Sequence, residues 1–151
     1  MEIIVLDQSV PHQRAFSFLK CGSYLVTGTF DESADIYALA WVTRVSANPP
    51  LISIVVNKGD HDHDLIINSD YLIVHLIADG QIDEDTLRFH RKIPNKITSS
   101  VNNAPLLIGS FAAYGCNNIG KVETETQTII IATIDYSEIN HTKTPHHLSK
   151  K

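Results

Sequence analysis

The sequence predicts a mainly β fold, a closed or partly closed antiparallel barrel of about six strands with a few short helices. Short runs of β-branched and aromatic residues recur along the chain, and turn residues separate them. No helical segment alternates regularly with these runs, so the βαβ period of a parallel sheet is missing. The chain has 151 residues, which is the length of one domain and enough to bury a core without disulfides or a metal ion.

The first half of the chain predicts one short helix and then strands. Ser9 and Pro11 favour a helix start and Gly22 favours its end, so we expect an amphipathic helix over residues 11–20. The period then becomes that of strands, because apolar residues begin to alternate with polar ones. We expect a hairpin of strands 24–30 and 36–45 around a turn at 31–33, an interruption at Asn48-Pro49-Pro50, and a buried strand over 51–56.

The second half predicts further strands and short helices. Asn57 to Asp60 has loop composition, and a short helix over 61–68 follows it. We expect a strand over 71–77, a polar helix over 83–91, and strands over 105–114, 120–126 and 128–136. After Asn140 the sequence becomes polar and rich in histidine. Residues 1–140 are therefore expected to form the domain, and residues 141–151 a mobile tail.

Composition and charge exclude several classes of partner. The formal net charge of −5, from 12 basic and 17 acidic residues, disfavours a nucleic-acid partner, which needs a basic face. No apolar stretch approaches the ~20 residues that span a bilayer, and the short run from Ile3 to Leu6 lacks the flanks of a signal peptide. The only cysteines, Cys21 and Cys116, form no Cys-x-x-Cys motif. We expect a cytoplasmic protein without a membrane partner.

The motifs of several enzyme classes are missing. The chain has no Gly-x-Gly-x-x-Gly, Walker loop, Gly-x-Ser-x-Gly or His-Glu-x-x-His, which disfavours dinucleotide-fold, nucleotide-hydrolase, esterase and zincin functions. His61 and His63 invite a metal interpretation, but residues two apart on a helix point about 200° apart and cannot share one ligand sphere. No metal site is predicted. His75 alternates within its strand and is expected to be a hydrogen-bonded barrel residue.

A central block of the chain carries a specific pattern. It runs from Trp41 through Val45-Ser46 and Pro49-Pro50-Leu51 into a β-branched strand, and then into the loop Asn57-Lys58-Gly59. This order and spacing resembles the core signature of the flavin reductase-like family, over roughly residues 23–92. The resemblance implies an FMN-binding split β-barrel that works as a homodimer with the flavin at its interface. It also implies transfer of hydride between NAD(P)H and the flavin.

The resemblance assigns the flavin ring to one strand. Carried over by position, Tyr37, Ala38, Leu39 and Ala40 would give the isoalloxazine ring backbone hydrogen bonds and apolar contact, and Val45 and Ser46 would follow the ring and the ribityl chain. The family often has Thr or Ser at positions 38 and 40, so the side-chain bonds that tune a flavin are lost here while the backbone bonds remain. The alternative is that Ala38 and Ala40 are ordinary inward strand positions.

The loop after the next strand is expected to hold the flavin phosphate. Asn57, Lys58 and the backbone N–H groups of residues 59–63, which include Gly59, His61 and His63, would provide the contacts. A glycine loop that enters a helix N-terminus offers unpaired donors and a positive dipole end, and Lys58 adds a full charge. Three aspartates, at positions 60, 62 and 64, oppose a phosphate dianion. The alternative for Asp60 is a helix N-cap.

Three further residues have two interpretations each. Trp41 is expected to pack in the core or in the dimer contact, with flavin contact as the alternative. Arg88 and Lys92, on the predicted polar helix, would neutralise the flavin phosphate, or would belong to a solvated helix face.

Two functions remain open at this point. The first is an NAD(P)H-dependent FMN reductase, in which flavin N5 carries the chemistry and no side chain acts as acid or base, so no catalytic residue is assigned. The second is a non-catalytic FMN-holding electron carrier of the flavoredoxin type, or a split barrel that has lost its reductase activity and binds another ligand.

Overall fold

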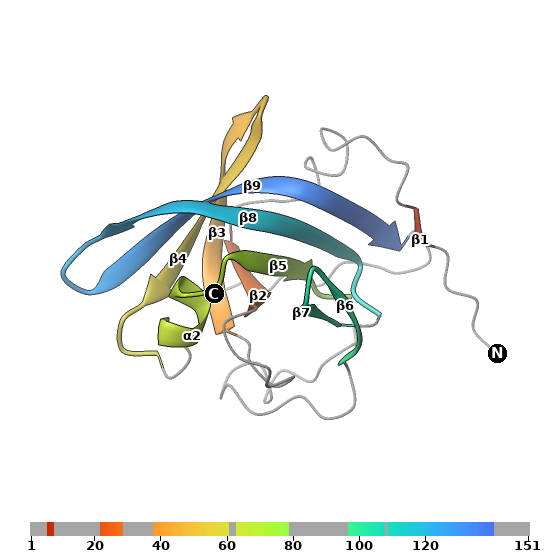
Figure 1. The fold of residues 1–151 in the computed structure, drawn as a ribbon, viewed down its shortest axis with the longest axis horizontal. Helices are drawn as coiled ribbons and strands as arrows, with labels where there is room; N and C mark the ends of the chain where they lie inside the picture. The colour runs from red at the N-terminus through yellow and green to blue at the C-terminus, as the bar shows by residue number, and fades with distance from the viewer. Residues whose placement is uncertain are drawn as a thin grey trace.

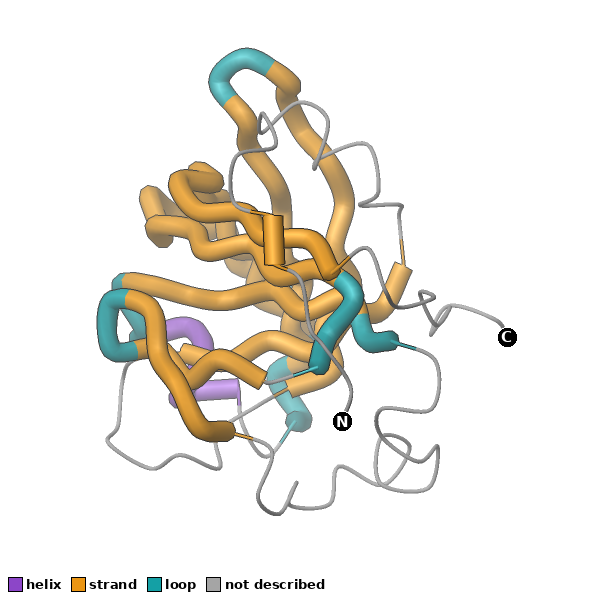
Figure 2. Tube along the Cα trace, turned by 90° about the vertical axis from the view of Figure 1, so that its right-hand side faces the viewer, coloured by secondary structure: helices purple, strands orange, loops and turns teal. Residues whose placement is uncertain are grey.

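A computed structural model describes residues 6–7, 22–28, 38–60, 63–78, 97–107 and 109–140 of the chain. Most of this part is strand, and the strands wrap into a barrel (Figures 1 and 2). The elements are β1 (Leu6–Asp7), β2 (Gly22–Gly28), β3 (Ala38–Ala47), β4 (Pro50–Asn57), α2 (His63–Ile67), β5 (Tyr71–Leu76), β6 (Ile97–Val101), β7 (Ala104–Leu107), β8 (Ala112–Glu123) and β9 (Gln127–Asn140).

Strand pairing closes the sheet into a ring, which confirms the predicted barrel. The order is β1-β9-β4-β3-β2-β5-β8, and β9 also pairs with β8, so six strands from β9 to β8 form the ring. Every ladder between neighbours in the ring is antiparallel. β9 closes the ring because it is long enough to pair with β4 along its first half and with β8 along nearly its whole length. The two-residue β1 pairs with the end of β9.

The interior of the ring is filled by side chains. In β4, Ile52, Ile54 and Val56 are buried while the residues between them are half-buried, which is the period-two pattern of a strand with one face on a core. Buried side chains from all six ring strands meet in one cluster, which Ile66 of α2 joins. The barrel is thus a packed core, as in other small barrels, and a flavin-sized ligand would have to lie outside it.

Several predicted elements are confirmed in place and type. Strands β2 and β3 pair as the expected hairpin, β4 and β5 match the predicted strands 51–56 and 71–77, and α2 lies inside the predicted helix 61–68. Pro50 does not lie outside the ladder but is the first residue of β4, where a missing N–H is tolerated. The predicted helices 11–20 and 83–91, the turn 31–33 and the tail 141–151 lie outside the described residues.

The prediction for the region after residue 96 is wrong in two respects. A hairpin of β6 and β7 was not expected, and the predicted strand 105–114 is interrupted between β7 and β8. The interruption contains Gly109, whose φ is 92°. Glycine adopts this conformation without steric cost, and the conformation ends the strand. The hairpin turns at Asn102 and Asn103, with φ of 48° and 69°, a conformation that asparagine tolerates better than most residues. The predicted strand 120–126 is the end of the much longer β8.

The β6–β7 hairpin covers the outer face of β5. Tyr71 and Ile73 of β5 pack there with Ala104 and Leu106 of β7, in a second cluster outside the barrel. Strand β5 is therefore buried on both faces, and every one of its residues is buried. Near this cluster the hydroxyl of Thr27 in β2 donates to the carbonyl of Pro105 at 2.6 Å.

His75 ties three strands together inside this packing. Its Nδ1 donates to the carbonyl of Leu25 in β2 at 3.1 Å, and its Nε2 accepts the N–H of Leu107 in β7 at 3.1 Å. Because a backbone N–H can only donate, Nε2 must be unprotonated and the ring neutral. Complete burial lowers the pKa of His75 to about 4, although the bond to Leu25 opposes this shift. The prediction of a hydrogen-bonded barrel histidine is confirmed.

A buried tyrosine lies over a glycine on the same outer side. The hydroxyl of Tyr71 donates to Oδ1 of Asp135 at 2.7 Å, and the amide of Asn117 donates to Oδ2 of the same carboxylate at 2.7 Å. A methyl group on Gly115 would lie 2.1 Å from the Tyr71 hydroxyl and 2.9 Å from Cβ of Tyr136. Only glycine leaves the space that the tyrosine occupies. Burial and then Asp135 raise the pKa of Tyr71, so this hydroxyl stays protonated.

Candidate functional site

One edge of β3 is the feature that fits a planar ligand. Pairing between β3 and β4 begins at Trp41, opposite Val55, whereas pairing with β2 begins three residues earlier at Ala38. Residues 38–40 thus have ladder partners on the β2 side only, as far as the described chain shows. Figure 1 shows β3 and β4 diverging at this end. Backbone groups that no ladder uses can hydrogen-bond the polar edge of a heterocyclic ring.

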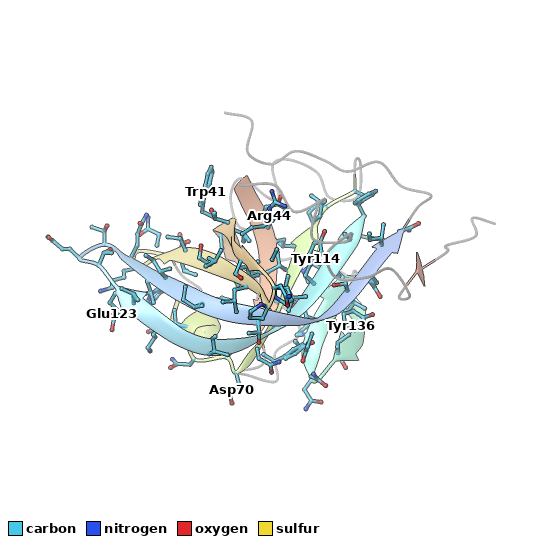
Figure 3. The ribbon with its side chains drawn as sticks, turned by 90° about the horizontal axis from the view of Figure 1, so that it is seen from above. Trp41, Arg44, Asp70, Tyr114, Glu123 and Tyr136 are labelled. Carbon is cyan, nitrogen blue, oxygen red and sulfur yellow. The ribbon has the colours of Figure 1, made fainter. Side chains whose placement is uncertain are left out.

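The side chains of this strand divide between the core and the surface. Ala40 is 1 % exposed and belongs to the barrel core, so only its backbone can contact a ligand. Trp41, the next residue, is 45 % exposed, and Figure 3 shows it projecting away from the barrel. Trp41 is therefore not a core residue of the single chain. The side chains of Ala38 and Leu39, and all of Tyr37, lie outside the described part.

The loop from Asn57 to Asp60 begins beside this edge. If the β3–β4 register continued past Trp41 and Val55, Asn57 would lie level with Leu39. Most backbone donors of the loop are already used within the protein. The N–H of Lys58 donates to Thr126 at 2.9 Å, that of Gly59 to Oδ1 of Asn57 at 2.9 Å, and that of Asp60 to the Asn57 carbonyl at 3.0 Å. Among the described groups of the loop, the side chain of Lys58 is therefore the one best suited to contact a phosphate.

Two side chains of the β8–β9 hairpin hold this region. Oε1 of Glu123 lies 3.2 Å from Nζ of Lys58, and Oγ1 of Thr128 lies 2.8 Å from Nε2 of His63. Glu123 and Thr128 face each other across the ladder, so both contacts come from one position on the hairpin. His63 is buried, and its other ring nitrogen lies 2.9 Å from Oδ1 of Asp64. The imidazole thus joins α2 to β9 and has both nitrogens engaged within the protein.

Sequence reasoning missed Glu123 and Thr128. Their contribution depends on the ladder that places Glu123 opposite Thr128, around a turn closed by Thr124 and Gln127. The signal in the sequence was the pair of strands predicted at 120–126 and 128–136. Their register relative to Lys58 was not readable from residue types.

Val45 and Ser46 lie at the opposite end of β3. The register shifts between Arg44 and Ser46, which is a β-bulge, and Val45 is 52 % exposed. Five residues of extended strand separate Val45 from Ala40, which is about 16 Å. Ser46 is level with Leu51, at the start of β4, whereas the 57–60 loop follows the end of β4. The structure does not bring these two predicted residues to the loop.

An apolar row crosses the outer face of four strands. Trp41 faces Val55, Val55 faces Ile129, and Ile129 faces Val122 in the successive ladders β3–β4, β4–β9 and β9–β8. Residues directly opposite in an antiparallel ladder share a face. Trp41 and Val122 are the exposed members, at 45 % and 57 %, while Val55 and Ile129 are half-buried. We call this set the outer apolar row.

Some predicted site residues cannot be placed. His61, Arg88 and Lys92 lie outside the described residues. Among the residues that are described, no three His, Cys, Asp or Glu side chains gather as a metal site. The described helix is too short to cross a membrane.

Comparison with known proteins gives a consistent family. The family model "Flavin reductase like domain" matches residues 16–148. The NADH:FAD oxidoreductase SgcE6 of Streptomyces globisporus superposes with a TM-score of 0.69 at 19 % identity, covering 95 % of each chain. The FMN-binding protein of Thermus thermophilus gives 0.66 at 18 % identity, over 83 % of this chain and 76 % of the other. Flavoredoxin of Methanosarcina acetivorans gives 0.63 at 15 % identity, over 83 % and 74 %.

A curated relative is much longer than this chain. Diflavin flavoprotein A 1 of Synechocystis is 20 % identical over 130 residues, which are 81 % of this chain and 23 % of the relative. The chain thus spans about a quarter of that protein.

Proposed function

Because the chain belongs to the flavin reductase-like domain family, we propose that it is an FMN-binding oxidoreductase that takes hydride from NADH or NADPH. The observation that carries this proposal is the edge of β3 at residues 38–40, whose backbone is outside the β4 ladder and beside the Lys58 loop. This edge provides the hydrogen-bonding groups that a flavin ring needs, and Lys58 provides a cation for a phosphate.

The residues divide into a ring end and a phosphate end. Tyr37 to Ala40 hold and orient the isoalloxazine ring through their backbone. Lys58 contacts the phosphate, and His61, Arg88 and Lys92 are further candidates for that end. Asn57 and Gly59 act through the loop, since the Asn57 side chain accepts the Gly59 N–H and fixes the turn that carries Lys58. Val45 and Ser46 lie further along β3, about 16 Å from Ala40 in the case of Val45. We therefore assign them to the part of the flavin that lies at the subunit contact.

Bound FMN supplies the hydride-accepting chemistry, and the protein's task is to position it and to limit the access of water. No side-chain acid or base is needed for that transfer. FMN, rather than FAD, is proposed because the loop after β4 carries Lys58, whose ammonium group suits the terminal phosphate of FMN. We also propose a cytoplasmic location. Cys116 is a buried free thiol, as a reducing compartment permits, and burial raises its pKa.

A second candidate is an FMN-holding electron carrier. It is favoured by the carboxylate of Glu123, which pairs with Lys58, because negative charge at the site opposes the binding of a second anionic nucleotide such as NADH. Residues 141–151 are also polar, with Leu148 the one aliphatic residue among them, so these eleven residues contribute little apolar contact for a nicotinamide. In this case a protein partner replaces the nicotinamide as donor.

Flavin titration followed by anaerobic reduction tests the proposal and separates the two candidates. We expect the apoprotein to bind FMN with micromolar affinity or better, seen as a change in flavin fluorescence. NADH or NADPH should then bleach the flavin absorbance slowly, with poor affinity for the nucleotide. Absence of FMN binding at tens of micromolar protein would reject both candidates. Reduction by dithionite but by neither nucleotide would leave the electron carrier.

We also propose that the protein is a homodimer with the flavin at its interface. The outer apolar row exposes Trp41 and Val122, and Val45 and Ile119 are exposed as well. Large apolar side chains grouped on one strand face are typical of a surface that another protein covers. A two-fold related copy is the commonest partner, and it would cover the side of the flavin that one barrel leaves open.

Charge introduced into the outer apolar row should separate the subunits. Val122→Lys is expected to shift the mass measured by light scattering from twice 16.8 kDa to 16.8 kDa at micromolar concentration, because the lysine cannot be buried unpaired. Ser100→Lys adds the same charge at an exposed strand position outside the row and should leave the dimer intact. A wild-type monomer in the presence of FMN contradicts the dimer, and a Val122→Lys dimer excludes this face.

A further inference from the structure

The side chain expected to bind the flavin phosphate already has a partner in the protein. Nζ of Lys58 and Oε1 of Glu123 are 3.2 Å apart, and both side chains are accessible to water, at 34 % and 58 % exposure. An ion pair of this exposure is weak and exchanges its partners readily. A ligand phosphate that approaches Lys58 therefore competes with a carboxylate that is built into the fold.

The ladder between β8 and β9 positions the backbone of Glu123. Glu123 lies in the ladder opposite Thr128, whose hydroxyl contacts buried His63. The carbonyl of Thr126, in the same hairpin, accepts the N–H of Lys58 itself at 2.9 Å. The loop and the hairpin are thus joined by a backbone bond, an ion pair and a hydrogen bond to His63. The backbone of Glu123 is therefore held beside the Lys58 loop, while its exposed side chain can still exchange partners.

The charge around Lys58 adds to the competition. Asp60 follows two residues after Lys58 in the loop, and Asp64, in the first turn of α2, contacts the ring of His63. Together with Glu123, which contacts Lys58, the nearby Asp60 adds negative charge to the region of the loop's lysine. A dianionic phosphate gains from Lys58 but is repelled by its neighbours, whereas an uncharged ribityl terminus is affected by neither.

We propose that Glu123 is a specificity-determining residue that competes with the flavin phosphate for Lys58, and so sets how strongly the protein prefers FMN to riboflavin. The proposal rests on the proposed flavin function and concerns the phosphate end of that site. Glu123 lowers the affinity for the phosphorylated flavin and leaves the affinity for riboflavin unchanged. The carboxylate acts through Lys58, so its effect disappears when Lys58 is removed.

The test compares FMN with riboflavin by fluorescence titration of the full chain. Glu123→Gln keeps the size of the side chain and removes its charge. It should tighten FMN by about two- to five-fold, the range that an exposed ion pair supports, with no change for riboflavin. Lys58→Ala should remove most of the preference for FMN. Adding Glu123→Gln to Lys58→Ala should then have a smaller effect than it has alone, because the two side chains are coupled.

Glu125→Gln is the matched control. It removes the same charge from the same hairpin, at an exposed residue of the turn. A gain in FMN affinity with Glu123→Gln alone supports competition at Lys58. Equal gains with both variants would mean a general field effect and would overturn the proposal. Thermal unfolding of each variant shows whether the fold is kept. If Glu123→Gln proves unstable, Glu123→Asp replaces it: its side chain is one methylene shorter, which withdraws the carboxylate from Lys58 and should tighten FMN in part, and no gain would overturn the proposal.

The outcomes also separate this proposal from the flavin function itself. If both flavins bind and Glu123→Gln leaves their affinity ratio unchanged, Glu123 has no such role while the flavin function stands. If neither flavin binds to the wild type, the proposed function fails and the role of Glu123 fails with it.

Discussion

Folding stability is expected to fall by about 3 kcal/mol as the pH is lowered from about 6.5 to about 4, because of His75 alone. The folded protein holds this ring neutral, with a pKa of about 4, whereas the unfolded chain has the ordinary value of 6.5. Below pH 6.5 the unfolded state gains a proton that the folded state refuses, and below about 4 both states are protonated. The stabilisation is therefore complete above pH 6.5 and is lost on acidification.

Urea unfolding of the wild type and of His75→Leu across this pH range measures the effect. The variant should lose about 2–4 kcal/mol at neutral pH, because the N–H of Leu107 and the carbonyl of Leu25 lose a partner in a dry environment. Its free energy of unfolding should also depend less on pH than that of the wild type. Parallel pH profiles for the two proteins would show that His75 is not the group responsible.

Gly115→Ala is expected to destabilise the protein by about 2–3 kcal/mol, because the added methyl group and the Tyr71 hydroxyl cannot occupy the same space. The methyl carbon would lie 2.1 Å from that oxygen and 2.9 Å from Cζ of the ring. Tyr71 would have to move, and its bond to Asp135 would be strained or lost. Chemical denaturation of the purified variant gives the change in unfolding free energy.

Two further variants test whether the loss in Gly115→Ala comes from the clash with Tyr71. Gly120→Ala lies in the same strand, where a methyl group would meet nothing within 4 Å, and should cost far less. Tyr71→Phe removes the atom that lies closest to the new methyl group. The double variant with Gly115→Ala should therefore cost less than the sum of the two single changes. Equal losses for Gly115→Ala and Gly120→Ala would point to a general cost of replacing glycine in β8.

The barrel was predictable from the sequence because its strands carry their own signals. The alternation of Ile52, Ile54 and Val56 with less buried residues marks a strand with one buried face, and turn residues mark the β2–β3 hairpin. The β6–β7 hairpin was missed because β6, Ile97-Thr98-Ser99-Ser100-Val101, is mostly polar and turns through two asparagines rather than Asn-Gly. It is held by what it covers, Tyr71 and Ile73 of β5, and such packing has no local signature.

The site was predictable only in part. The sequence singled out the β3 segment and the lysine loop as the candidate site, since both follow from the motif order that resembles the family. It did not show that Thr126 already accepts the N–H of Lys58, or that Glu123 pairs with the Lys58 side chain, because both contacts depend on the register of strands more than sixty residues away. It also did not show that Ser46 is level with Leu51 at the start of β4, while the 57–60 loop follows the end of β4. Chain order gives neighbours along a strand, and only the ladders give neighbours across it.

The double pairing of β9 has a consequence for how the chain reaches its native state. Leu51 pairs with Thr133, and the other β4 positions pair with β9 across similar separations, so we expect the β4–β9 ladder to form later than the local hairpins. Closing such long loops is slow compared with forming a hairpin. While the ribosome is still making β9, the nascent polypeptide exposes two unpaired edges, on β4 and on β8, each rich in groups that can capture another chain. Strand β9 thus closes the barrel, and the chain is most prone to self-association before β9 has paired with β4 and β8.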